Sequence, residues 1–360
     1  MTNPVPGAAA MAAVRNAAER RAQESAGDAA APVPGPLPVP VPVPGAEPVQ
    51  DCPGDGSTPP EFVLTISCPD RPGIVARVTR LLYENGGNIE ESQQFDDARS
   101  DYFFMRIRFS AVEDTKAVGA AEGVGSAAEG LADQATVQVW RERMAPIAQE
   151  FGMTWELWSA TAPYRALLMV SKAGHCLNDL LFRWQTGALN MTIPAIVSNH
   201  RDLEPLARSY GIPFHHIPIT ADAKAQAEDE LMALVEEHDV DLVVLARYMQ
   251  VLSDRLCQRM SGRIINIHHS FLPSFKGGKP YHQAFERGVK LVGATAHYVT
   301  ADLDEGPIIE QDVTRVDHRM GPSDLVRAGQ DVEADVLSRA VKWHCDSRVI
   351  LNTDRTVVFS

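Results

Sequence analysis

From Glu61 onward, the spacing of apolar residues predicts a regular succession of strands and helices. Within residues 102–109, large apolar side chains at every second position alternate with a mixed set that includes two arginines. This period of two predicts a strand with one buried face and one mixed face. The buried set is Phe103, Met105, Ile107 and Phe109, and the mixed set is Phe104, Arg106 and Arg108.

The elements around this strand predict a small sheet with two helices. The order is strand, helix, two strands, helix, strand, and Asn85-Gly86-Gly87 is typical of a helix end. This βαββαβ order is that of a ferredoxin-like unit. The predicted strands are 62–67, 88–95, 102–109 and 154–158, and the predicted helices are 72–84 and 137–151.

From Arg165 the chain alternates between single strands and helices. Alternation of this kind predicts a Rossmann-like α/β domain with a mostly parallel sheet and helices on both faces. Its ligands bind at the carboxyl ends of the strands. The predicted strands are 166–170, 192–197, 214–217, 241–245 and 264–268, and the predicted helices are 176–186, 203–210, 223–238 and 253–260.

Two segments depart from these patterns. Residues 1–60 hold 13 of the 25 prolines, which favour extended polyproline II, so we predict a disordered Ala/Pro-rich tail. Acidic residues among its arginines disfavour an organelle transit peptide. An Ala/Gly-rich stretch near 117–133 is predicted to be an inserted surface loop. We therefore place the domains at 61–160 and 161–360.

Composition narrows the class of ligand. The 360 residues carry a formal net charge of -14, which disfavours a sequence-independent nucleic-acid surface or an acidic membrane as partner. No stretch reaches the roughly 18 apolar residues that a membrane helix needs. The five cysteines lack metal-ligand spacing, so we expect reduced thiols, no metal and a soluble cytoplasmic protein.

Two polar motifs indicate chemistry. Asn266 and His268 are two residues apart at a predicted strand end, so their side chains point to one side, and Asp304 follows in a tight turn. Taken alone, an Asn-x-His pair is more typical of a strand-end hydrogen bond and a core histidine. Together the motifs resemble those of the folate-dependent formyltransferase and formyl-hydrolase superfamily, which implies that Asn266, His268 and Asp304 are catalytic.

Each of these residue types fits one need of formamide chemistry. Asn266 can donate to the oxyanion, and His268 can donate too or move a proton toward the leaving nitrogen. Asp304 can orient His268 and order the attacking water. We expect Leu303 to pack inward, with Asp302 and Glu305 facing solvent.

The resemblance also implies a folate site. The segment after the strand 241–245 would hold the pterin ring through Met249, Gln250, Val251 and Leu252. The alternative is that its apolar residues belong to the core. His297 precedes the Asp304 turn and could line the same pocket, although His269 and His297 are otherwise structural candidates.

The segment Cys68–Val75 resembles the first loop and helix start of ACT domains, which bind small molecules, often amino acids, and pair through their sheets. The resemblance implies an effector site and a homo-oligomer. A plain strand-to-helix turn is the alternative. The candidate effector-binding residues are Asp70, Arg71, Gly73 and Ile74.

The first loop of the second domain separates branches of the superfamily. Residues 171–177 contain one glycine, unlike the phosphate-cradling loop of the glycinamide ribonucleotide formyltransferases, although Lys172 leaves that function open. The stretch 268–284 and the ACT-like unit resemble instead the branch that hydrolyses 10-formyltetrahydrofolate. We therefore expect formate and tetrahydrofolate as products, formate supply to purine and one-carbon metabolism, and no cofactor. A formyltransferase to an amine and a non-catalytic folate or amino-acid sensor stay as alternatives.

Overall fold

The computed structural model describes residues 59–111, 127–220, 222–272 and 280–360. The predicted tail lies outside these ranges except for Pro59 and Pro60, as does the part of the Ala/Gly-rich stretch before Ala127. Among the described residues no helix combines the length and apolar character that crossing a membrane requires. The four cysteines in this part of the chain, Cys68, Cys176, Cys257 and Cys345, are all buried and form no disulfide.

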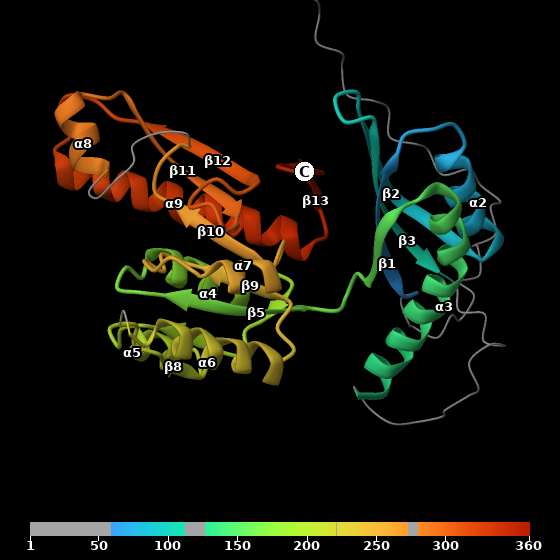
Figure 1. The fold of residues 1–360 in the computed structure, drawn as a ribbon, viewed down its shortest axis with the longest axis horizontal. Helices are drawn as coiled ribbons and strands as arrows, with labels where there is room; N and C mark the ends of the chain where they lie inside the picture. Colours follow the sequence, from blue (N-terminus) through green and yellow to red (C-terminus); the bar gives the residue numbers. More distant parts are fainter. Residues whose placement is uncertain (1–58, 112–126, 221, 273–279) are drawn as a thin grey trace, which may run out of the picture. The chain divides into compact units, whose positions relative to one another are not determined.

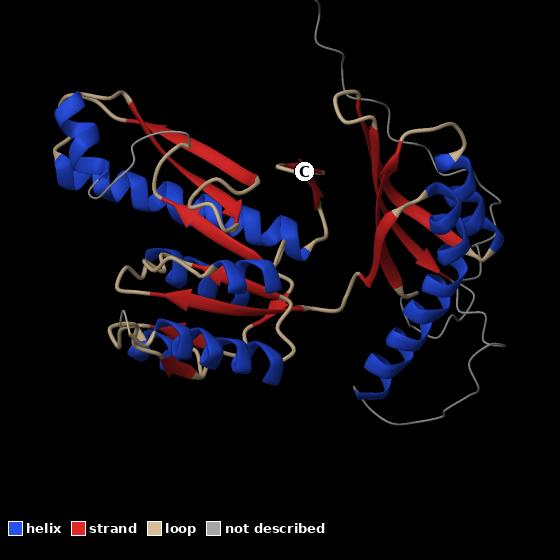
Figure 2. Cartoon of the chain, in the orientation of Figure 1, coloured by secondary structure: helices blue, strands red, loops and turns tan. Residues whose placement is uncertain are grey.

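The first domain has the predicted ferredoxin-like order. Its four antiparallel strands lie in the order β2-β3-β1-β4, and both helices cover one face of this sheet (Figures 1 and 2). The elements are β1 (Glu61–Pro69), α2 (Ile74–Glu84), β2 (Gly87–Asp97), β3 (Tyr102–Ala111), α3 (Ala127–Phe151) and β4 (Thr154–Ser159).

The alternating face of β3 builds the core of this domain. Phe103, Met105, Ile107 and Phe109 all lie in one apolar cluster with residues of both helices, as predicted. The opposite face is more buried than its mixed composition indicates, because Arg106 is only 3% exposed.

Both helices of this domain begin at residues other than those predicted. Helix α3 begins at Ala127, ten residues before the predicted start, so residues 127–132 are helical rather than loop. Alanine has the highest helix propensity of all residues, which favours this extension. Helix α2 begins at Ile74, because Gly73 has a left-handed φ of 101° that cannot continue a helix.

The second domain is a doubly wound sheet. The strand order is β12-β11-β10-β9-β5-β7-β8, with parallel pairing from β10 to β8 and antiparallel pairing of β10, β11 and β12. The mostly parallel sheet is therefore as predicted. The strands are β5 (Tyr164–Val170), β6 (Met191–Thr192), β7 (Ile196–Ser198), β8 (Phe214–His216), β9 (Leu242–Leu245), β10 (Ile264–His268), β11 (Leu291–Tyr298), β12 (Ile308–Arg315), β13 (Val349–Asn352) and β14 (Arg355–Val358), and the helices are α4 (His175–Gln185), α5 (Glu204–Ser209), α6 (Lys224–Glu237), α7 (Asp254–Arg259), α8 (Pro280–Arg287) and α9 (Pro322–Cys345).

Successive residues of β5 face two different cores. Leu168 and Val170 pack with α4 and α9, whereas Leu167 and Met169 pack with α6 and α7. This strand is buried on both faces, as expected for the middle of a parallel sheet. In a sheet of this kind, ligands bind at the carboxyl ends of the strands.

One predicted strand is divided in the structure. Within the predicted strand 192–197, Thr192 ends β6 and Ile196 begins β7, and Pro194 lies in the segment between the two strands. Proline lacks the N–H that a continuous ladder needs, which explains the interruption.

Candidate active site

Asn266 and His268 lie on the same face of β10, at the carboxyl end of the parallel part of the sheet. Strand β11 pairs with β10 in antiparallel register, so that Asn266 is opposite His297 and His268 is opposite Thr295. The pairing places His297 beside Asn266, although the two residues come from different strands.

Asp304 reaches this strand end from the turn between β11 and β12. Its φ is 59°, in the left-handed region. The turn also depends on Gly306, where an added Cβ would lie 1.8 Å from the carbonyl oxygen of Tyr298. Only glycine allows this close approach of the turn to β11.

The structure brings the three predicted catalytic residues together with His297. His268 Nδ1 lies 3.2 Å from Asp304 Oδ1, and the same oxygen lies 3.8 Å from His297 Nε2. Asn266 Nδ2 lies 3.2 Å from His297 Nε2. The four side chains therefore form one connected group.

His297 fixes the orientation of the Asn266 amide. Its Nδ1 lies 2.9 Å from the Tyr298 carbonyl oxygen and so donates to it, which leaves Nε2 to accept an N–H from Asn266. Burial lowers the pKa of His297, which is only 2% exposed, and so favours this neutral form. One N–H of Asn266 is then used by His297, and the other can serve a substrate oxygen.

Asp304 is held in its ionised form. The hydrogen bond from His268 lowers the pKa of this carboxyl below its ordinary value, although partial burial opposes the shift. His268 Nε2 is buried and has no hydrogen-bond partner among the described residues. Since Nδ1 is engaged by Asp304, Nε2 is the nitrogen available to a reacting group.

The neighbouring His269 stays neutral. Its ring meets that of His268 edge to face, with centroids 5.0 Å apart. Burial, together with the positive charges of Arg247 and His268, lowers the pKa of His269 to about 4. It therefore adds no positive charge beside His268 at neutral pH.

A cavity of about 240 Å³ opens beside these groups. Its walls are residues 247–252 after β9, the end of β10, and residues 299–304 with His297. All five predicted substrate-binding residues line it: Met249, Gln250, Val251, Leu252 and His297.

Two apolar residues of this wall, Met249 and Val251, are not core residues. Met249 is 58% exposed and Val251 is 54% exposed, which excludes the core interpretation for both. Leu252 is partly buried against the apolar cluster of α6 and α7. Exposed apolar side chains that line a cavity suit a flat organic ligand.

One expectation about the Asp304 turn is wrong. Leu303 does not pack inward but is 64% exposed and lines the cavity. Gly306 and Pro307 occupy the buried side of the turn instead. Asp302 and Glu305 are exposed, as expected.

Two buried groups that the sequence did not single out hold the cavity wall. Ser171 Oγ, at the end of β5, accepts the Met249 N–H at 3.1 Å. The Glu228 carboxylate accepts the Ser253 N–H at 2.8 Å and also its hydroxyl. No local pattern marks either residue, because both act on distant parts of the chain.

The candidate effector residues lie at the start of α2. Ile74 is 2% exposed within the core, so its side chain cannot contact an effector without a rearrangement. Arg71 donates to the Glu150 carbonyl and lies over the Phe151 ring, 4.3 Å from its centroid. The exposed Asp70 donates its N–H to the Asp101 carbonyl at 2.9 Å.

Comparison with known proteins defines the class. Residues 62–123 match the ACT domain family, and residues 164–341 match the formyl transferase family. The chain is thus an ACT domain joined to a formyltransferase-type domain. A solved structure similar to part of this chain, glycinamide ribonucleotide transformylase 1 from Symbiobacterium toebii, is 29% identical, with a TM-score of 0.53 over 57% of this chain and 98% of that chain.

More similar relatives cover both domains. The formyltetrahydrofolate deformylase of Corynebacterium sp. (strain P-1) is 49% identical over 82% of this chain and 97% of the relative. The crystal structure of formyltetrahydrofolate deformylase from Burkholderia mallei is 51% identical, with a TM-score of 0.75 over 84% of this chain and 100% of that chain. The chain belongs to the formyltetrahydrofolate deformylase family.

Proposed function

We infer that the protein hydrolyses 10-formyltetrahydrofolate to formate and tetrahydrofolate. Family membership gives the reaction. One structural observation supports its location: the unpartnered Nε2 of His268 lies beside Asp304 and Asn266, at a cavity lined by exposed apolar side chains.

Hydrolysis requires three events at the formyl group. Water adds to the formyl carbon, the carbonyl oxygen becomes an oxyanion, and the bond to the folate nitrogen breaks as that nitrogen takes a proton. Asn266 donates its second N–H to the oxyanion, and a lost donor of this type costs on the order of 10²–10³ in rate. His297 acts on Asn266 by holding its amide in place.

His268 and Asp304 carry out the proton transfers. The ionised Asp304 orders the attacking water and accepts its proton, and its bond to Nδ1 orients the imidazole. In this step His268 carries a proton on both ring nitrogens and delivers the one on Nε2 to the leaving nitrogen, directly or through the oxyanion; the proton taken up by Asp304 then leaves to solvent as Nε2 is reprotonated. The two protons of water thus end on the folate nitrogen and on formate or solvent.

The pterin ring of the substrate occupies the cavity. Met249, Val251 and Leu303 offer apolar contact to its faces, and Gln250 offers an amide to its polar edge. His297 and Leu252 complete the wall. Because the site supplies both the oxyanion donor and the proton carriers, we propose that turnover needs neither cofactor nor added metal.

The wider setting is also a proposal. An amino-acid effector at the ACT domain would use Asp70, Arg71 and the backbone at Gly73, and ACT pairing would give a homo-oligomer. The formate would feed purine and one-carbon metabolism. A cytoplasmic location fits the four buried and unpaired thiols.

The test is formate release from 10-formyltetrahydrofolate by the purified full chain, with no amine acceptor and no added metal. We expect rapid release by the wild type and very slow release by Asp304→Asn. Binding of the folate without release would contradict the hydrolase function and favour a formyltransferase to an amine or a sensor.

A further inference from the structure

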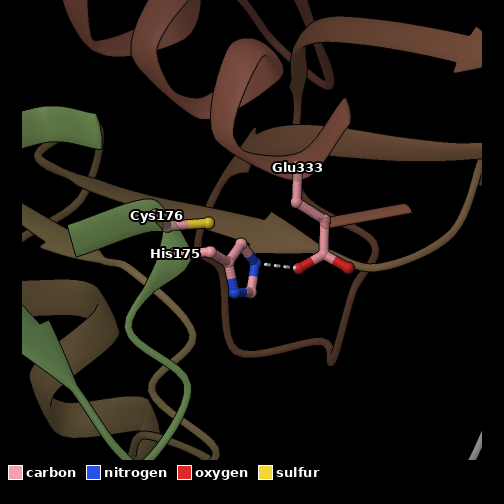
Figure 3. A group of neighbouring side chains, drawn as sticks. All are labelled: His175, Cys176 and Glu333. Atoms are coloured by element: carbon pink, nitrogen blue, oxygen red, sulfur yellow. Dashed lines mark hydrogen bonds and ion pairs between the residues drawn. The ribbon is translucent and has the colours of Figure 1, made fainter. Parts of the chain in front are cut away.

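A buried carboxylate outside the proposed catalytic group joins three separate parts of the second domain. Glu333, on α9, is 1% exposed. Its Oε2 lies 2.8 Å from His175 Nε2 and 3.2 Å from Arg247 Nε, and its Oε1 accepts the Tyr281 hydroxyl at 2.5 Å. Figure 3 shows the His175 ring facing this carboxylate, with Cys176 beside it.

This cluster is better suited to an ion pair than to a metal. Donor atoms of His175, Cys176 and Glu333 lie within 4.8 Å of one another. Both carboxylate oxygens, however, already accept from protein donors, and the Arg247 cation beside Oε2 would repel a divalent ion. Burial alone would raise the pKa of Glu333, but His175, Arg247 and Tyr281 together hold it below its ordinary value, so the carboxylate is charged.

Arg247 connects Glu333 to the cavity. It follows β9, lines the cavity, and begins the wall that continues to Leu252. Its φ of 68° is in the left-handed region, which a residue with a side chain adopts only when its surroundings hold it there. The ion pair with Glu333 is a contact that can hold it.

A missing side chain on α9 makes room for this network. A Cβ at Gly329, one turn before Glu333, would lie 2.2 Å from the Tyr281 ring. The Tyr281 hydroxyl can therefore reach Glu333 because position 329 is glycine. The same ring meets His269 edge to face, with centroids 6.5 Å apart.

We propose that Glu333 is a positioning residue for folate binding, which acts through Arg247 to fix the cavity wall at residues 247–252. Ser171 and Glu228 hold the middle and the end of this wall, and Glu333 holds its beginning. The proposal rests on the folate site inferred above. It assigns Glu333 no contact with the reacting atoms.

The variant Glu333→Gln tests the proposal, because glutamine keeps the size of the side chain but not its charge. We expect KM for 10-formyltetrahydrofolate to rise on the order of tenfold, with kcat within about threefold of wild type, since a loosened wall weakens binding of substrate and transition state alike. Asp335→Asn is the matched control, because Asp335 lies on the same helix as Glu333 and forms an exposed ion pair with Arg183 of α4. Its KM should equal that of the wild type.

A double-mutant cycle then asks whether Glu333 acts through Arg247. Glu333→Gln combined with Arg247→Met should raise KM no further than Arg247→Met alone. Additive effects of the two substitutions on KM would overturn the proposal. A Glu333→Gln variant with a lower melting temperature and a lower kcat but an unchanged KM would overturn it too. If Glu333→Gln does not fold, an unchanged KM in Arg247→Met overturns it equally.

A second readout separates this proposal from the proposed function. Calorimetric titration with tetrahydrofolate should give a Kd raised by a similar factor in Glu333→Gln, whether or not the wild type releases formate. Wild-type turnover with an unchanged Kd in the variant would contradict the positioning role alone. Absent wild-type turnover with a raised Kd would contradict the hydrolase function alone.

Discussion

His268 Nδ1 lies 3.2 Å from Asp304 Oδ1, across the gap between the end of β10 and the turn after β11. The same oxygen lies 3.8 Å from His297 Nε2. Because burial favours neutral His297, with Nδ1 donating to Tyr298, the Asp304 charge is balanced mainly by its hydrogen bond from His268. His268 is thereby held with Nε2 free for the substrate.

Asp304→Asn should lower kcat by about 10²–10⁴ while leaving folate binding nearly unchanged, because it removes the charge that orients His268 and activates water. Steady-state formate release and tetrahydrofolate binding measure the two effects. Glu305→Gln, in the same turn and exposed, is the control and should keep wild-type turnover. Equal turnover in both variants would exclude Asp304 from the mechanism.

Asn266→Ala should lower kcat by roughly 10²–10³ through loss of the oxyanion donor. His297→Leu removes the acceptor that orients this amide, so we expect a smaller loss, on the order of tenfold. The double variant should be no slower than Asn266→Ala alone, since His297 acts through Asn266. Multiplying losses would instead indicate an independent role for His297.

Met249→Ser should raise KM several-fold and change the free energy of unfolding by no more than about 0.5 kcal/mol, because this side chain is exposed in the cavity wall. Leu252→Ala should destabilise the fold by about 1–3 kcal/mol, because Leu252 packs against the core. Urea unfolding and initial rates measure both variants. A large loss of stability in Met249→Ser would restore the core interpretation.

The free energy of unfolding should decrease in mild acid because His344 is buried in its neutral form. Burial lowers the pKa of this histidine to about 4, and its Nδ1 accepts the Tyr298 hydroxyl at 2.7 Å. Well above about pH 6.5 the side chain is neutral in both states, so it has no effect on stability. As pH falls toward 4, the unfolded chain binds a proton that the folded one does not, which lowers the free energy of unfolding by up to about 3 kcal/mol.

Urea unfolding at pH 7 and pH 5 tests this dependence. His344→Gln should lose less stability between the two values than the wild type, because the glutamine does not titrate. The other histidines, among them His269 with a pKa of about 4, are present in both the wild type and the variant. Both proteins therefore still lose some free energy of unfolding at the lower pH. Identical losses in the two proteins would contradict a role for His344.

Local spacing predicted that Asn266 and His268 point to one side, and the resemblance to the folate-dependent formyltransferases implied that Asp304 joins them. Asn266 and His268 had to share one face of β10, because side chains in a strand alternate with a period of two. The succession of strands and helices likewise predicted the ferredoxin-like unit and the mostly parallel sheet. What such patterns predicted less well were details set by backbone geometry, such as the outward direction of Leu303 and the division of a strand at Pro194.

The sequence by itself therefore determined the order of elements and the shared face of Asn266 and His268 on β10, since both depend on short-range periodicity. The motifs, through their resemblance to known families, added the two domain types and the role of Asp304. Only the tertiary structure decided that His297 lies against Asn266 and that Glu333 meets Arg247, His175 and Tyr281. These residues come from separate elements, and their side chains are of ordinary polar types. The pairing of β11 with β10 and the packing of α9 against the sheet create these contacts, and no local pattern in the sequence predicts them.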